Sequence, residues 1–275
     1  MERLPITNDF VFKRIYAKKG NEEILKDLLI SILEIPIEKV EVIAEANLER
    51  KLEKDKLGIL DIKAILDDKT IVNIEVQVIN YYNMVERSLF YWSALYHESL
   101  KAGESFEKNK RVITINLLNF KLFEEGTFHE IGRLKRDYEN ILLTKQLELH
   151  FIQMPKFSEG NKEVNRKLRQ WMYFISNQNK GEIEMEIKEN KEIEKANEEL
   201  EYLSGDEEAR RLAYLREKAL RDEANNLIGA REEGIKQGAK EKEIEIAKKM
   251  LQENVDIGLI EKITELTREE IERLK

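Results

Sequence analysis

The chain has 275 residues and a mass of 32.5 kDa, which fits one domain of catalytic size plus an extension. It contains no cysteine, so neither a disulfide nor a thiolate zinc site can form. Charged residues make up 37%, and the net charge of −8 argues against a chain that coats nucleic acid through overall attraction. The N-terminus lacks a signal-peptide pattern, and no segment approaches the roughly 18 uncharged apolar residues of a membrane helix. We therefore expect a cytoplasmic protein without membrane contacts.

Two short helices are expected at the N-terminus. Thr7 is a suitable N-cap for a helix that begins near Asn8 and has one apolar side. Asn21 is expected to cap a second helix over residues 22–33. Asp9 lies in the first turn of the first helix, where a carboxylate stabilises the helix dipole.

The central feature of the sequence is a predicted β-hairpin that follows a first strand over residues 40–48 and a charged connection. Residues 59–66 and 70–78 are rich in Ile, Val and Leu, and the polar residues 67–69 form the turn between them. Alternate residues of a strand share one face of the sheet. One face of this hairpin is wholly apolar: Ile62, Ala64, Leu66, Val72, Ile74, Val76 and Val78.

The loop length of the hairpin decides whether its polar residues meet. With a three-residue loop, Asp61 lies opposite Glu75, and with a two-residue loop their carboxylates point to opposite faces. Only the first register places four polar residues on one surface: Asp61, Lys63, Glu75 and Gln77. Two opposed carboxylates repel each other unless a cation such as Mg²⁺ neutralises them. A solvated sheet face is the alternative, and the concentration of polar residues on one side counts against it.

An Asp on one strand followed by Glu-X-Gln on the next resembles the PD-(D/E)XK nuclease superfamily, whose motif is Asp…Glu-X-Lys. More narrowly, the chain resembles the Rpn family of recombination-promoting nucleases and transposases. The matching segments are residues 7–13, 60–64, 74–78 and 87–91. Their order and spacing are more specific than any one of them. The resemblance implies an α/β fold with a central mixed sheet flanked by helices, like that of restriction endonucleases. It also implies a metal-dependent DNA endonuclease that uses Mg²⁺, with Mn²⁺ or Ca²⁺ as alternatives.

The resemblance assigns roles to the polar residues of the hairpin. Asp61 and Glu75 are expected to hold the metal ion, and Asp9, an acidic residue of the first helix, is the candidate to join them. Gln77 stands where most of the superfamily has Lys, and a neutral amide orients water without supplying positive charge. Lys63, two residues after Asp61, is our candidate for the missing cation.

A third helix is expected over residues 84–101, ending at Gly103. Its apolar spacing predicts a buried stripe of Leu89, Trp92, Leu95 and Tyr96. Arg87 and Tyr91 lie one turn apart on another side. The simplest interpretation of this pair is that Arg87 forms a salt bridge and Tyr91 lies at the rim of a buried surface. The resemblance implies instead that both line the active-site cleft and that Arg87 binds a phosphate.

Two more strands and a helix complete the predicted core. Residues 111–119 and 147–154 are as rich in apolar residues as buried strands are, and residues 161–177 are expected to be helical. The helix carries a basic stripe of Lys162, Arg166 and Arg169. Such a stripe is usually a solvated face, and contact with the DNA backbone is the alternative.

The C-terminal part is dominated by Glu and Lys, which is typical of a long exposed helix. It lacks sustained heptads, so we expect it to pack against the core or a second subunit, forming a homodimer. Thr-Arg-Glu-Glu at 267–270 matches a capping box in a final apolar-periodic stretch. The expected division is a nuclease-like domain, a charged helical extension and a small helical module: residues 1–180, 181–243 and 244–275.

Two functions remain after these observations. The leading one is the metal-dependent nuclease, because binding alone gives no reason to oppose Asp61 and Glu75. The other is a DNA- or protein-binding module on the same fold without hydrolysis, which Gln77 and the negative net charge favour. A purely structural scaffold explains the C-terminal helices but not the hairpin.

Overall fold

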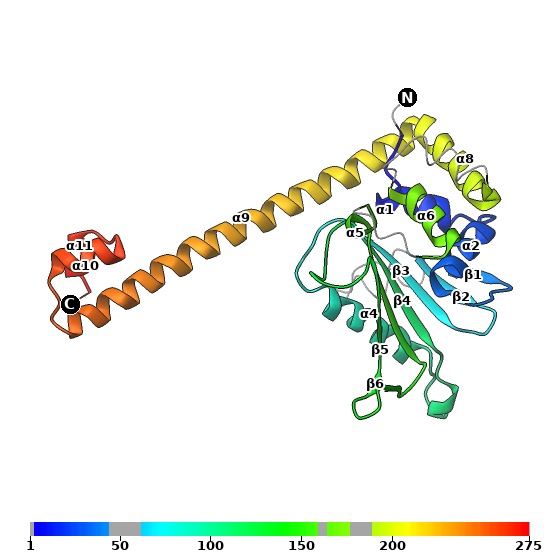
Figure 1. The fold of residues 1–275 in the computed structure, drawn as a ribbon. Helices are drawn as coiled ribbons and strands as arrows, with labels where there is room; N and C mark the ends of the chain where they lie inside the picture. Colours follow the sequence, from blue (N-terminus) through cyan, green and yellow to red (C-terminus); the bar gives the residue numbers. More distant parts are fainter. Residues whose placement is uncertain (1–2, 44–61, 159–163, 177–188, 275) are drawn as a thin grey trace. The chain divides into compact units, whose positions relative to one another are not determined.

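The computed structural model describes residues 3–43, 62–158, 164–176 and 189–274. The chain forms two compact units, Met1–Lys218 and Ala219–Lys275. A six-stranded mixed sheet lies at the centre of the first unit, with strands in the order β1-β2-β3-β4-β8-β5 (Figure 1). These strands are β1 (Val40–Ile43), β2 (Ile62–Leu66), β3 (Ile71–Gln77), β4 (Val112–Leu118), β8 (Leu147–Gln153) and β5 (His129–Arg133). The α/β fold predicted from the sequence is confirmed.

The sheet combines an antiparallel meander with a parallel centre. Strands β1, β2 and β3 are antiparallel, β3, β4 and β8 are parallel, and β5 pairs antiparallel with β8 at the edge. The sequence did not reveal β5 or the small pair β6 (Lys135–Arg136) and β7 (Ile141–Leu142). These strands are short and none of their residues is fully buried, so they lack the apolar runs that marked β4 and β8.

The hairpin of β2 and β3 has the register of a three-residue loop. Lys63 lies opposite Asn73, and Ile62 lies opposite Ile74. Backbone hydrogen bonds close the loop, since Leu66 N donates to Thr70 O at 2.9 Å. The predicted apolar face is buried along both strands, except for Val78, which is 36% exposed.

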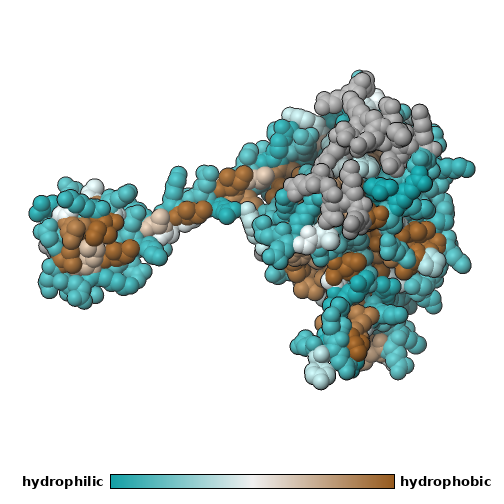
Figure 2. Space-filling view, in the orientation of Figure 1, coloured by the Kyte–Doolittle hydropathy of each residue, from teal (hydrophilic) through white to brown (hydrophobic). Residues whose placement is uncertain are grey.

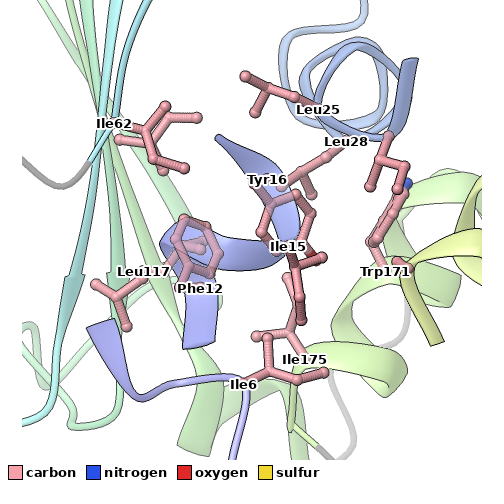
Figure 3. Close-up of a cluster of buried hydrophobic side chains, with 14 of the residues drawn as sticks. Ile6, Phe12, Ile15, Tyr16, Leu25, Leu28, Ile62, Leu117, Trp171 and Ile175 are labelled. Atoms are coloured by element: carbon pink, nitrogen blue, oxygen red, sulfur yellow. The ribbon is translucent and has the colours of Figure 1, made fainter. Parts of the chain in front are cut away.

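Helices α1 (Asp9–Tyr16), α2 (Glu22–Leu33) and α6 (Arg166–Ser176) pack against this apolar face. Figure 3 shows aromatic side chains of α1 and α6 in this core, with Phe12 next to Tyr16 and Tyr16 near Trp171. The N-cap of α1 is Asn8 and not Thr7, because Asn8 Oδ1 accepts from Phe10 N at 3.1 Å. The predicted bounds of α2 are confirmed.

Helix α4 (Met84–Glu98) covers the opposite face of the sheet. Its buried stripe is Met84, Ser88, Tyr91 and Leu95. The predicted stripe was therefore wrong at Leu89, which is 41% exposed. The helix turns Ser88 toward the sheet because the strands carry polar residues there, and Ser88 Oγ lies 3.2 Å from Asn116 Oδ1.

Helices make up the C-terminal part, as predicted. Helix α8 (Lys191–Gly205) packs against α1 and α2, and α9 (Glu207–Gln252) follows it. In the second unit, the end of α9 packs with α10 (Ile257–Thr264) and α11 (Arg268–Glu272) around Ala247, Ile260, Leu266 and Ile271. The capping box of Thr267 and Glu270 is present. The three-part domain division stays a prediction. No helix in the described ranges is long and apolar enough to cross a membrane.

Candidate active site

The candidate site is built on the face of β3 that α4 covers. Asn73, Glu75 and Gln77 alternate along the strand and therefore share this face. Glu75 is 1% exposed, and Asn73 is fully buried. A carboxyl group is rarely buried to this extent without a specific partner or role.

Two amides from the same strand hold the carboxylate of Glu75. Asn73 Nδ2 donates to Glu75 Oε1 at 3.2 Å, and Gln77 Nε2 donates to Glu75 Oε2 at 3.3 Å. Both donors are neutral, so they orient the carboxylate without cancelling its charge. Gln77 thus contacts Glu75 directly, whereas the sequence had suggested only that its amide orients water.

Lys63 lies beside this group on β2, across from Asn73. Its side chain is 13% exposed, and its Nζ lies 3.4 Å from Glu98 Oε2 at the end of α4. Asp61, the second predicted metal ligand, lies outside the described residues. Its position opposite Glu75 would extend the observed register by one residue and stays a prediction.

Arg87 and Tyr91 of α4 are in contact, as their spacing predicts. The Arg87 guanidinium lies over the ring of Tyr91 at 5.3 Å and over that of Tyr81 at 5.9 Å. Tyr91 is buried rather than at a rim. Arg87 Nε is buried and has no hydrogen-bond partner among the described residues.

Asn116 on β4 belongs to the same polar face and was missed by the sequence reasoning. It lies beside Glu75 in the parallel register of β3 and β4 and is 1% exposed. Its Nδ2 donates to His150 O at 3.0 Å, which fixes the amide. In the sequence, Asn116 could have been recognised as an amide within the apolar run that forms β4.

The donor atoms at this site suit a hard cation. The Glu75 carboxylate and Asn73 Oδ1 are oxygen ligands of the kind Mg²⁺ takes, and Asn73 Oδ1 is buried without a hydrogen-bond partner in the part of the chain that is described. No group of three or more His, Asp or Glu residues suited to a metal ion occurs among the described residues. Mg²⁺ often uses only one or two protein carboxylates, so the residues present fit it.

Two other predicted contributors belong to elements that pack on the opposite, apolar face of the sheet. Asp9 begins α1, where its Oδ1 accepts from Phe10 N at 2.8 Å and its Oδ2 lies 3.7 Å from Arg216 Nε. Arg166 of α6 is exposed and pairs with Glu189, and Arg169 is half-buried. Lys162 lies outside the described residues. Glu75, Gln77 and Lys63 thus belong to the face of the sheet that α4 covers, and their common role with Asp9 and the basic stripe stays a prediction.

A second polar cluster lies between β8 and β5, on the apolar face. His129 Nε2 is 2.8 Å from His150 Nδ1, and His150 Nε2 is 2.8 Å from Glu148 Oε1. Arg111 and Arg133 pair with the same carboxylate at 2.9 and 3.1 Å. In the sequence, this cluster could have been recognised from Glu148 and His150, which stand at alternate positions of an otherwise apolar strand. The contact with His129 could not be seen, because β5 was not predicted.

Burial and neighbouring charges set the protonation of this cluster. Burial raises the pKa of Glu148, but hydrogen bonds from His150 and Arg133 outweigh it and hold this pKa well below its usual range. Desolvation by burial lowers the pKa of His129 to about 4 and also lowers that of His150. Both imidazoles are therefore neutral at pH 7. His150 then donates to Glu148 and accepts from His129.

Comparison with known proteins agrees with the geometry. Residues 6–230 match the family described as PD-(D/E)XK nuclease family transposase. No curated protein and no solved structure matches the chain. The match spans most of the sequence and includes β2, β3 and α4, which carry the candidate site. The chain belongs to the PD-(D/E)XK nuclease family of transposases.

Proposed function

We propose that the chain is a Mg²⁺-dependent endonuclease that hydrolyses phosphodiester bonds of DNA in recombination or transposition. The observation that carries this proposal is the carboxylate of Glu75, buried in a sheet and oriented at both oxygens by neutral amides. Such a group is costly to bury, and buried titratable groups cluster at functional sites. Family membership makes phosphodiester hydrolysis the matching chemistry.

Each residue of the site has a distinct role in this proposal. Glu75 and Asp61 would hold the metal ion, and Asp9 stays a further candidate ligand although its helix packs on the other face of the sheet. Bound Mg²⁺ would offset negative charge on the phosphate and lower the pKa of the attacking water. Gln77 orients Glu75, and its remaining amide oxygen is available to the water. Lys63 supplies positive charge.

DNA contacts form a second part of the proposal. Arg87, whose guanidinium lies over the rings of two tyrosines, would donate to a phosphate. The basic stripe of Lys162, Arg166 and Arg169 remains a proposed backbone contact. Arg166 would have to exchange its partner Glu189 for a phosphate to take part.

Plasmid cleavage tests the enzyme directly. Purified full-length chain is incubated with supercoiled DNA and Mg²⁺, Mn²⁺, Ca²⁺ or EDTA. We expect nicked or linear DNA with Mg²⁺ or Mn²⁺ and none with EDTA. Glu75→Gln and Asp61→Asn should each lower the rate at least ~100-fold, because each removes a charge that holds the metal. Glu38→Gln, at an exposed position, is the matched control and should cleave as wild type.

The second candidate is a binding module that does not hydrolyse DNA. The pairing of Lys63 with Glu98 favours it, because that ammonium already has an acidic partner. Wild-type protein that binds DNA in a gel-shift assay, yet cuts it with none of the three metals, would replace the nuclease with this function.

A further inference from the structure

A pocket of about 410 Å³ lies at the end of the sheet where β3, β4 and β8 begin. Three segments line it, the turn before β3, the loop before β4 and the loop before β8: residues 68–70, 108–111 and 144–146. Backbone hydrogen bonds join these segments. Ile71 N donates to Arg111 O at 2.9 Å, and Val112 N donates to Gln146 O at 3.0 Å. The three lining segments are therefore held together where the strands begin.

The lining is strongly basic in a chain with net charge −8. Five basic residues, Lys69, Lys108, Lys110, Arg111 and Lys145, accompany one acidic residue, Asp68. The carboxylate of Asp68 is engaged within its own turn, where it accepts from Thr70 N at 2.8 Å and from Thr70 Oγ1 at 2.9 Å. The positive charge around the pocket is therefore largely uncompensated by its lining.

Some lysines of the described residues have ionic partners, and those of this pocket do not. Lys18, Lys195 and Lys249 each form an ion pair with a glutamate. The four pocket lysines form no ion pair with any described residue. Such a concentration of unpaired ammonium groups attracts a polyanion.

Arg111 adds a directional donor to this charge. Its Nη2 pairs with Glu148 at 2.9 Å, which fixes the guanidinium. Its Nε is buried and has no partner among the described residues. An oxygen acceptor in the pocket would satisfy this N–H, and phosphate oxygens are strong acceptors for guanidinium groups.

The distance to Glu75 indicates which phosphate compound fits. Thr70 at the pocket and Glu75 lie five residues apart on an extended chain, or about 17 Å. This length corresponds to about five base pairs of duplex DNA, at roughly 3.4 Å per step. A polymer can occupy both places at once, whereas a mononucleotide cannot.

We propose that this pocket binds backbone phosphates of the DNA strand whose scissile bond lies at Glu75. The proposal rests on the nuclease function above and adds a substrate-binding surface that is separate from Arg166 and Arg169 of α6. The pocket contributes to the affinity for DNA and to the position of the bound strand. It does not recognise bases, because lysines contact phosphates as point charges.

The salt dependence of DNA binding tests this pocket. Fluorescence anisotropy with a labelled duplex in EDTA measures binding without cleavage. The variant Lys108→Ala/Lys110→Ala/Lys145→Ala should bind at least ~10-fold more weakly near 0.1 M NaCl. Its slope of log affinity against log salt should be shallower by about 2–3, since each lost phosphate contact removes about 0.9. The loss should be similar for duplexes of different sequence.

A matched control removes the same charge elsewhere. Lys19→Ala/Lys191→Ala/Lys236→Ala alters three exposed lysines outside the pocket and should keep the wild-type slope. Equal losses in both triple variants would overturn the proposal, because only net charge would then matter. An unchanged slope in the pocket variant, with unchanged melting temperature, would overturn it as well.

Two further experiments distinguish DNA binding at this pocket from a failure of catalysis and from binding of free phosphate. Glu75→Gln should lose cleavage but keep the wild-type salt slope, so failure of catalysis and failure of the pocket are distinguishable. Inorganic phosphate supplies the same chemistry without a polymer. If it raises the melting temperature of wild type but not of the pocket variant, while both bind DNA equally, the pocket takes free phosphate and the DNA proposal is wrong.

Discussion

The hydrogen bonds around Glu75 give a physical reason for a glutamine at position 77. Gln77 and Asn73 donate to different oxygens of the carboxylate, and both donors are neutral amides. A lysine at position 77 would instead place an ammonium against the same oxygen. The glutamine therefore favours cation binding at Glu75, and any positive charge needed for hydrolysis has to come from another side chain.

Lys63 is the side chain that we expect to supply this charge. Lys63→Ala should lower the single-turnover cleavage rate about 100-fold while leaving metal affinity unchanged, because a positioned charge acts mainly on the transition state. Quenched-flow cleavage and a metal titration measure the two quantities.

Glu98→Gln separates this role from a merely structural ion pair. It removes the partner of Lys63 but keeps the ammonium. If Lys63 serves only the ion pair, both variants will change the rate alike. Wild-type cleavage in Lys63→Ala would end the hypothesis.

At the scale of elements, the edge strand β5 is joined to β8 by an unusual polar contact. The imidazoles of His129 and His150 meet on the face that is otherwise apolar, and Glu148, Arg111 and Arg133 continue the chain of hydrogen bonds. Glu34 lines the same cavity of about 550 Å³ as the two histidines. This contact needs at least one neutral imidazole, because two protonated rings would set two N–H groups and two positive charges against each other.

Acidification should therefore destabilise the first unit. The pKa of His129 is about 4 in the folded chain and near 6.5 when unfolded. Between these values the unfolded chain binds more protons, so stability falls as pH falls. His129 should account for a loss of about 2–3 kcal/mol between pH 7 and pH 4.5. Urea unfolding of wild type and His129→Gln at both values measures the difference.

The glutamine variant keeps an amide donor for His150 but cannot take up a proton, so its stability should depend less on pH. His97 is exposed at the end of α4, and His97→Gln should behave as wild type. An identical pH dependence in wild type and His129→Gln would show that the imidazole pair does not control acid stability.

The sequence predicted those elements whose pattern is local. The two strands of the hairpin, β4 and β8 followed from apolar runs, and α2 followed from its cap, whereas the choice between two hairpin registers came from the structure. The rotation of α4 was missed because Ser88 is buried against Asn116, a contact between distant segments. The basic pocket was missed for the same reason, since its lysines come from three loops that only the sheet brings together.

On the scale of the whole molecule, the long helix α9 carries exposed apolar side chains. Ile228 is 55% and Ile235 is 62% exposed, and their spacing of seven places them on one side of the helix. Figure 2 shows apolar surface along this helix and on the C-terminal module. Burial against a second copy would remove this surface from water.

We expect the full chain to form a homodimer through α9. Ile228→Glu/Ile235→Glu should shift it to monomer in light scattering at about 50 µM, because charges replace the apolar contact at a cost of several kcal/mol. Asn226→Glu/Gln237→Glu adds the same charge at exposed polar positions and should remain dimeric. A wild-type chain that is monomeric at this concentration would contradict the expectation.

The alternation of β3 also limits how its gene can change. Every second residue of this strand faces the core, and those between them face α4. Insertion of one codon between Ile71 and Glu75 would turn the glutamate into the apolar core and bring a core residue under α4. Codon insertions in β3 should therefore be absent among functional descendants, whereas the loop between β4 and β5 can lengthen without moving either face of the sheet.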